Sequence, residues 1–152
     1  AIMTLMMLIG GSPGSTAGGM KTTTIAVLIL NAFATFGREA ETEVFGRRFD
    51  NTVVKNAATI AILYFFLFFT GGIAISQIEH VALSDCLFET ASAVGTAGLT
   101  LGITTELGLV SHLILVVLMY LGRVGGLTLI YAAISVKIQS GAKRPLDKIT
   151  VG

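Results

Sequence analysis

The chain has 152 residues, of which 53% are hydrophobic and 12% are charged. A soluble domain carries charged residues at about twice that density, so the composition indicates an integral membrane protein. The net charge of +1 argues against a nucleic-acid partner, and the single cysteine, Cys86, cannot form a disulfide within the chain.

The first 36 residues are apolar but interrupted. Lys21 is the only charged residue among them, and the segment 10–19 contains Pro13 and five glycines. Proline and glycine both oppose a continuous helix. The sequence therefore predicts a membrane helix that is broken at 10–19 and resumes over 20–36. Since the chain begins inside an apolar run with no charged leader, we expect it to be a fragment of a longer protein.

Two further apolar segments are long enough to cross a membrane, which takes about 20 residues. Residues 56–75 carry no charge, and residues 109–136 carry one, Arg123. A charge at membrane depth costs at least a few kcal/mol unless it faces protein or water. We therefore expect Arg123 to face the interior and to donate hydrogen bonds to backbone oxygens of 10–19. The alternative that stays open is a structural pair with an acidic residue elsewhere in the protein.

Basic residues are confined to two segments, which predicts the orientation. Residues 76–108 contain no lysine or arginine, whereas 37–55 and 137–152 are rich in both. Because basic loops stay in the cytoplasm, 37–55 is predicted to be a cytoplasmic loop and 137–152 a cytoplasmic C-terminal tail. Residues 76–108 are then outside.

The outer segment has the pattern of a re-entrant pore loop. Residues 82–94 predict a helix, with Ser84 as its N-cap, that is too short to cross the membrane. The glycine- and threonine-rich run 95–100 follows. A half-helix aims its negative C-terminal end at the membrane centre, and glycines allow carbonyls to replace the hydration shell of a cation. The alternative that stays open is an extracellular amphipathic helix and loop.

Two other functions compete with a pore. One is a secondary transporter of another fold, because broken helices also build substrate sites at the membrane midplane. The other is an intramembrane hydrolase that uses Ser12 or Ser15 with His112, since residues 10–14 match G-x-S-x-G. That motif needs a strand before the serine, and none is predicted. The glycines of 10–18 could also serve helix packing alone.

Three motifs carry a resemblance to a known family. They are GGSPGSTAGGMKTTT at 10–24, FETASAVGTAGLTLGIT at 88–104 and MYLGRVGGLTL at 119–129. Together they resemble the Trk/Ktr/HKT superfamily of potassium transporters, and most closely the membrane subunit of the bacterial Ktr type. The resemblance covers essentially the whole chain.

The resemblance implies an all-α membrane protein with four repeats of helix, pore loop and helix around one pore. Residues 1–36 would be the second helix of the penultimate repeat, and 56–136 the last repeat. The implied selectivity filter, with K⁺ at its carbonyls, comprises Val94, Gly95, Thr96, Ala97 and Gly98. The implied gate comprises Gly10, Gly11, Ser12, Pro13, Gly14, Ser15, Thr16, Ala17, Gly18, Gly19, Lys21 and Arg123.

The family also implies a function and partners. We expect potassium uptake across the plasma membrane by a multi-pass protein that is not an enzyme, with sodium as a candidate coupling ion and no cofactor in this chain. The expected partners are the upstream repeats of the same subunit, a second copy of the subunit, membrane lipid and a cytoplasmic ring of nucleotide-binding regulatory domains.

Overall fold

The computed structural model describes residues 2–15, 17–37, 43–44, 47–48 and 50–125. Its helices are α1 (Ile2–Ile9), α2 (Thr22–Phe36), α3 (Asn51–Glu79), α4 (Leu83–Gly95), the 3-10 turn η1 (Ile103–Glu106) and α5 (Leu109–Val124). Two two-residue strands, β1 (Glu43–Val44) and β2 (Arg47–Arg48), pair antiparallel between α2 and α3. The predicted all-α class is confirmed apart from this short pair.

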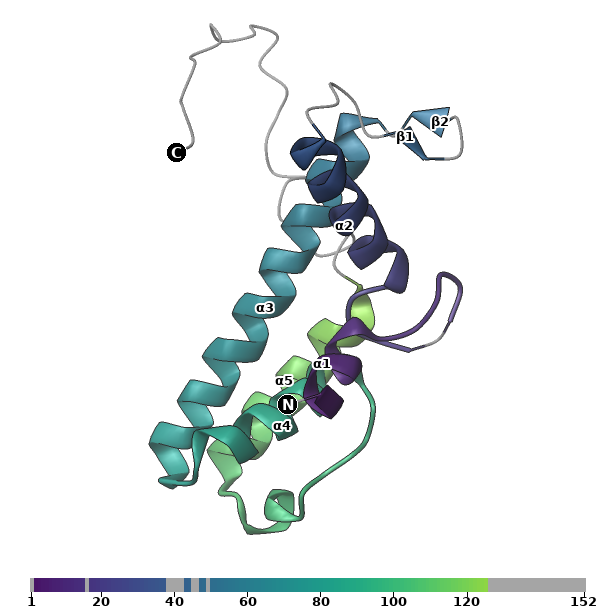
Figure 1. Cartoon of the computed structure of the whole chain (residues 1–152). Coiled ribbons are helices and arrows are strands. Elements are labelled where there is room, and N and C mark those ends of the chain that lie inside the picture. Colours follow the sequence, from purple (N-terminus) through teal and green to yellow (C-terminus); the bar gives the residue numbers. More distant parts are fainter. Residues whose placement is uncertain (1, 16, 38–42, 45–46, 49, 126–152) are drawn as a thin grey trace, which may run out of the picture.

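The long helix α3 is the scaffold of the molecule (Figure 1). Its N-cap is Asp50, whose carboxylate accepts a hydrogen bond from the Thr52 amide at 3.2 Å, and its C-cap is His80 in the left-handed conformation. The helix therefore extends beyond the predicted span 56–75 at both ends. Among the described helices, α3 is long and apolar enough to cross a membrane, whereas the apolar helices α2 and α5 are shorter.

The other helices pack around α3. Helix α2 lies against its first part, while α4 and α5 pack on its second part and on each other, and α1 lies against α4 (Figure 1). The core between them includes Tyr64, Ile75, Cys86 and Val94, each at most 1% exposed. The short helix α4 is therefore buried among three others rather than lying on the surface.

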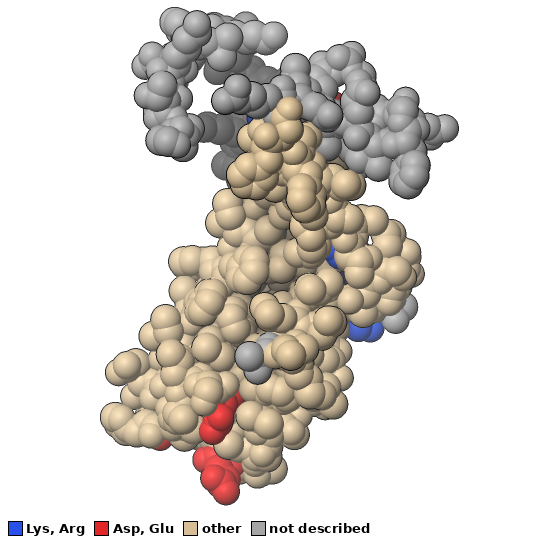
Figure 2. Space-filling view, viewed as in Figure 1, with Lys and Arg blue, Asp and Glu red and all other residues tan. Residues whose placement is uncertain are grey.

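Charged side chains are sparse on the described surface. On the face shown in Figure 2, acidic side chains lie at the lower end and basic ones near mid-height at the right edge, and most of the remaining described surface is uncharged. Large apolar side chains on α3 and α5 are exposed, among them Phe66 and Val116. A membrane protein leaves such a surface for lipid or for neighbouring helices.

One predicted boundary is wrong, and another lies outside the described residues. Ser84 is not the N-cap of α4: Ala82 takes that position, and the Ser84 hydroxyl donates to the Asp85 carboxylate at 3.1 Å within the first turn. Helix α5 ends at Val124, because Gly125 adopts a positive φ of 87°. The predicted continuation to residue 136 and the tail 137–152 lie outside the described residues.

Glycines allow α4 to approach its neighbours through the backbone. A Cβ on Gly122 of α5 would overlap the carbonyl oxygen of Val94, and one on Gly95 would overlap that of Met7. The same Gly122 carbonyl accepts a hydrogen bond from the Tyr64 hydroxyl at 3.3 Å. The end of α4 is therefore fixed between α1 and α5 by backbone contacts that a side chain would prevent.

This crossing predicts different effects for two helical glycines. Gly122→Ala should lower the free energy of unfolding by about 1–3 kcal/mol, because the new methyl meets rigid backbone. Gly72→Ala is the matched control: its methyl would meet the flexible end of the Leu87 side chain. Thermal unfolding in detergent should show a clearly lower midpoint for Gly122→Ala; equal midpoints would contradict the close crossing.

Candidate functional site

The chain reverses direction at the end of α4. Thr96 adopts the left-handed conformation, with a φ of 50°, and caps the helix by donating its amide to the carbonyl oxygen of Ala93 at 3.1 Å. The Ala97 amide donates to the carbonyl oxygen of Ser92 at 2.9 Å. These two bonds satisfy carbonyls that the helix end leaves open. The segment that follows therefore runs back along α4.

Side chains of α4 hold the returning segment. The Leu99 amide donates to the Ser92 hydroxyl and the Leu101 amide donates to the Glu89 carboxylate, each at 2.9 Å. Ser92 and Glu89 are three residues apart, so they lie on the same face of the helix. The returning segment is thus fixed through its amides, without joining a helix or a sheet.

The carbonyls of this segment are left available. Within the part of the chain that the structure describes, no carbonyl oxygen from Thr96 to Leu101 accepts a hydrogen bond. Gly98 has a φ of 74° and no heavy atom within 4 Å of where a Cβ would lie. Exposed carbonyls without partners, next to a helix C-terminus, are suited to bind a dehydrated cation.

The five predicted filter residues are contiguous in space but differ in setting. Val94 and Gly95 form the buried last turn of α4, Thr96 is half-buried at the start of the reversal, and Ala97 and Gly98 are exposed. The reversal rather than the helix end presents the open backbone.

The predicted break at 10–19 is confirmed: α1 ends at Ile9 and α2 begins at Thr22. The two ends of the break are tied together, since the Met20 amide donates to the Leu8 carbonyl at 3.1 Å and the Thr22 amide to the Gly11 carbonyl at 3.2 Å. Positive φ values at Gly10, Gly14 and Gly19 allow the intervening turns. The segment is therefore a loop closed at its base (Figure 1), and the predicted gate residue Thr16 lies outside the described residues.

The loop contacts the filter segment directly. The Gly18 amide donates to the Thr96 hydroxyl at 2.8 Å, and the Gly19 amide donates to the Gly122 carbonyl at 3.4 Å. Gly18 and Thr96 are 78 residues apart in the sequence. The fold thus brings the predicted gate and the predicted filter together.

The two cations of the predicted gate make different contacts. The Lys21 ammonium donates to the Ser15 carbonyl at 3.1 Å. The hydrogen bonds expected from Arg123 to 10–19 are not formed with the described residues of that segment, and the Arg123 side chain is exposed. It lines one cavity with Ser15, Gly18 and Lys21, and another with Ser92, Thr96 and Gly98. Lys21 can reach the Ser15 carbonyl because the two residues are only six apart in the sequence.

Sequence reasoning missed the contributions of Glu89, Ser92 and the Thr96 hydroxyl. The available signal was an acidic residue in the middle of a short helix, away from the first turn where Asp85 lies. An ionisable group in such a position indicates a specific partner.

Other candidate sites have weaker geometry. The His112 imidazole contacts the carbonyl oxygen of Gly108 at 3.0 Å, and the Ser15 hydroxyl accepts a bond from the Ala17 amide. No serine–histidine pair forms among the described residues. Within the same part of the chain, no three His, Cys, Asp or Glu residues form a metal-binding group.

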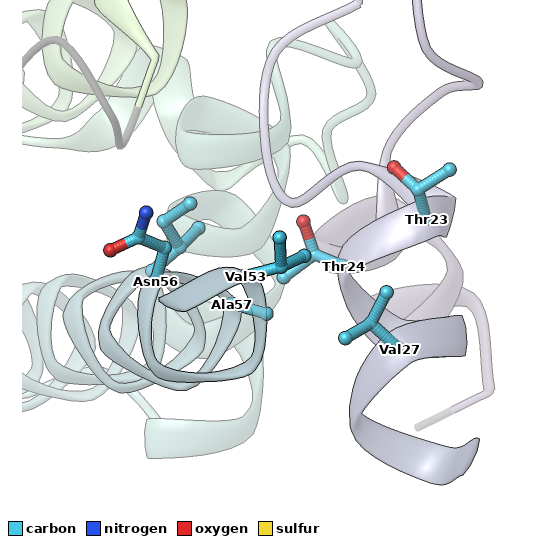
Figure 3. A pocket seen from close by; sticks show the side chains of 7 residues that line it. Thr23, Thr24, Val27, Val53, Asn56 and Ala57 are labelled. Atoms are coloured by element: carbon cyan, nitrogen blue, oxygen red, sulfur yellow. The ribbon is translucent and has the colours of Figure 1, made fainter. Parts of the chain in front are cut away.

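A groove between α2 and α3 is lined by uncharged side chains. Figure 3 shows that its lining comes from both helices: Thr23, Thr24 and Val27 on one side and Val53, Asn56 and Ala57 on the other. With no charged side chain in its lining, it has little means of binding an ion.

The chain is similar to known cation transport proteins over nearly its whole length. The TrkH family, described as "Cation transport protein", matches residues 1–142. The chain is 35% identical to the potassium/sodium uptake protein NtpJ of Enterococcus hirae and 33% identical to the Ktr system potassium uptake protein B of Bacillus subtilis, in each case over 97% of this chain. It is 39% identical to Ktr system potassium uptake protein B of Vibrio alginolyticus over 86% of this chain.

These matches cover 34%, 33% and 29% of the three relatives, so the chain spans about a third of their length. The resemblance predicted from the three sequence motifs is confirmed. The chain belongs to the TrkH family of cation transport proteins, which are membrane proteins and not enzymes.

Proposed function

We propose that this chain supplies one selectivity-filter loop and one intramembrane gate to a pore for potassium uptake across the plasma membrane. The observation that carries the proposal is the bond between the Gly18 amide and the Thr96 hydroxyl, beside a segment of unpaired carbonyls. A filter and an obstruction that touch each other are what a gated pore requires. The names of the relatives point to potassium, with sodium as the coupling-ion candidate.

The filter would bind the ion through backbone carbonyls of Thr96, Ala97 and Gly98. Carbonyl oxygens replace the water molecules around K⁺ at little net cost when they are held at the right spacing. The C-terminal end of α4 adds negative potential at the same point. Glycine at position 98 permits the left-handed backbone that the reversal needs.

The gate would be the loop 10–19. Its base is tied by backbone bonds between the ends of α1 and α2, while its contacts with Thr96, Gly122 and Lys21 are single hydrogen bonds. The two neutral bonds contribute about 1 kcal/mol net each, and the charged one from Lys21 about 1.5–3 kcal/mol. The loop could therefore leave the filter without unfolding the helices that carry it.

The rest of the pore would come from other repeats of the same subunit. We propose that the complete subunit pairs with a second copy in the lipid bilayer and is regulated by a cytoplasmic ring of nucleotide-binding domains. Residues 37–55 and 137–152 are the proposed cytoplasmic segments. A secondary transporter with a midplane substrate site is the competing function, which organic-solute uptake would favour.

The filter proposal predicts that Gly98→Ser weakens the preference for K⁺ over Na⁺ by roughly tenfold, since about 1–2 kcal/mol of backbone strain falls on the ion-binding carbonyls. The matched control is Gly14→Ser, because Gly14 also has a positive φ and open space around it. The control should keep the ion preference. Rubidium and sodium fluxes into vesicles containing the protein would measure both; an unchanged preference in Gly98→Ser would exclude the filter assignment.

The gate proposal predicts that deleting residues 12–18 raises K⁺ flux, because the deletion removes the obstruction and leaves both helices intact. The variant must keep its wild-type thermal midpoint for the comparison to count. Unchanged or abolished flux in a folded deletion variant would show that the loop serves packing alone.

The contacts of the two cations lead to a separate prediction. Lys21→Met should raise K⁺ flux, because it releases the Ser15 carbonyl while keeping the length of the side chain. Arg123→Ala should raise flux less, since Arg123 makes no described bond to the loop. Initial uptake rates of the two variants would be compared. A larger increase in Arg123→Ala would show that Arg123, and not Lys21, is the main residue that holds the loop closed.

A further inference from the structure

Glu89 is a buried carboxylate in the middle of α4. It is 4% exposed, and no basic side chain forms an ion pair with it among the described residues. A buried carboxylate needs hydrogen-bond donors in place of water. All of its donors come from one segment, residues 100–104, which continues directly from the proposed filter.

The two carboxylate oxygens bind three donors. Oε1 accepts from the Thr100 hydroxyl at 2.6 Å and from the Leu101 amide at 2.9 Å, while Oε2 accepts from the Thr104 hydroxyl at 2.7 Å. The Thr100 hydroxyl oxygen also accepts the Gly102 amide at 2.9 Å and lies 2.8 Å from the Thr104 hydroxyl oxygen. The side chain of Glu89 thus closes a small network around the outer half of the pore loop.

We infer that Glu89 is a positioning residue that determines ion selectivity. It acts through hydrogen bonds that depend on the length of its side chain rather than through its charge. The inference rests on the proposed filter function of residues 94–98. Glu89 contacts no filter carbonyl itself. It fixes the segment whose position sets the spacing of those carbonyls.

The physical reason is that the returning segment has few other attachments. Ser92 binds Leu99 close to the proposed filter, and Glu89 binds Thr100, Leu101 and Thr104. A site that separates two monovalent cations must hold its ligands within about half an ångström. Without the Glu89 network, the carbonyls from Thr96 to Gly98 would be free to shift by more than that.

Two conservative substitutions separate reach from charge. In Glu89→Gln, the amide oxygen still accepts from Thr100 and Leu101, and the amide nitrogen donates to the Thr104 oxygen, whose hydroxyl can then donate to Thr100. Glu89→Asp keeps the charge but is shorter by one carbon–carbon bond, about 1.5 Å. If Glu89 instead attracts cations to the outer mouth, Asp should be tolerated and Gln should not.

The experiment uses cells that express the full-length protein. It measures the ratio of K⁺ to Na⁺ uptake for wild type, Glu89→Gln, Glu89→Asp and Glu89→Ala. We expect the ratio to fall roughly tenfold in the Asp and Ala variants, the loss of about one charge-assisted hydrogen bond, and to stay within about twofold in the Gln variant. Glu106→Gln is the control, because Glu106 is acidic, exposed and in the same outer segment.

A second pair of variants leaves Glu89 in place. Thr104→Val removes one donor to the carboxylate, whereas Thr105→Val, one residue further on, removes a hydroxyl that binds the Gly102 carbonyl instead. We expect a lower ratio in Thr104→Val and a wild-type ratio in Thr105→Val. This pair gives a result even if Glu89→Ala fails to fold.

Hydrogen exchange of the Leu101 amide provides a readout that is independent of transport. It should be slow in wild type and Glu89→Gln, and faster in the Asp and Ala variants. If wild type takes up K⁺ and exchange changes as expected while the uptake ratio does not, the selectivity role is overturned and the pore function stands. Tolerance of Asp with loss in Gln would overturn the role of reach, and a wild type without K⁺ uptake would overturn the pore function itself.

Discussion

The carbonyl oxygen of Gly122 is the point at which the parts of this structure meet. It accepts hydrogen bonds from the Tyr64 hydroxyl of α3 at 3.3 Å and from the Gly19 amide of the broken segment at 3.4 Å. It is one of the last four carbonyls of α5, which have no partner inside the helix. Because Gly122 has no side chain, the end of α4 also packs directly against it at Val94.

The underlying constraint is that apolar surroundings offer no water to unpaired backbone groups. A helix that breaks at membrane depth must therefore bind its free ends to something else. Here the ends of α1 and α2 bind each other through Leu8 and Met20, and the loop between them binds Thr96 and Gly122. The proposed filter and the proposed gate are consequently not separate modules, since the interactions that complete the broken segment also join it to the segment after α4.

Two acidic residues are used as hydrogen-bond acceptors. Glu79, at the end of α3, accepts bonds from the Gly108 amide at 2.8 Å and from the Ser111 hydroxyl, which places a carboxylate at the N-terminus of α5. An anion is stabilising there. Glu89 accepts the bonds that hold residues 100–104. Two acidic side chains thus hold the two ends of the connection between α4 and α5.

The sequence determined much of the architecture. Long apolar runs predicted the helices, the glycine- and proline-rich run predicted the break at 10–19, and the short helix before residue 95 predicted the reversal. These features follow from local backbone preferences and from the absence of charge, which a sequence displays directly. Three motifs were also sufficient to predict the family.

Only the tertiary structure decided which groups meet. The bond from Gly18 to Thr96 joins residues that are 78 apart in the sequence. The network of Glu89 likewise requires the chain to turn back along α4. Hydrogen bonds act over about 3 Å, so they depend on packing geometry that neither residue spacing nor composition contains.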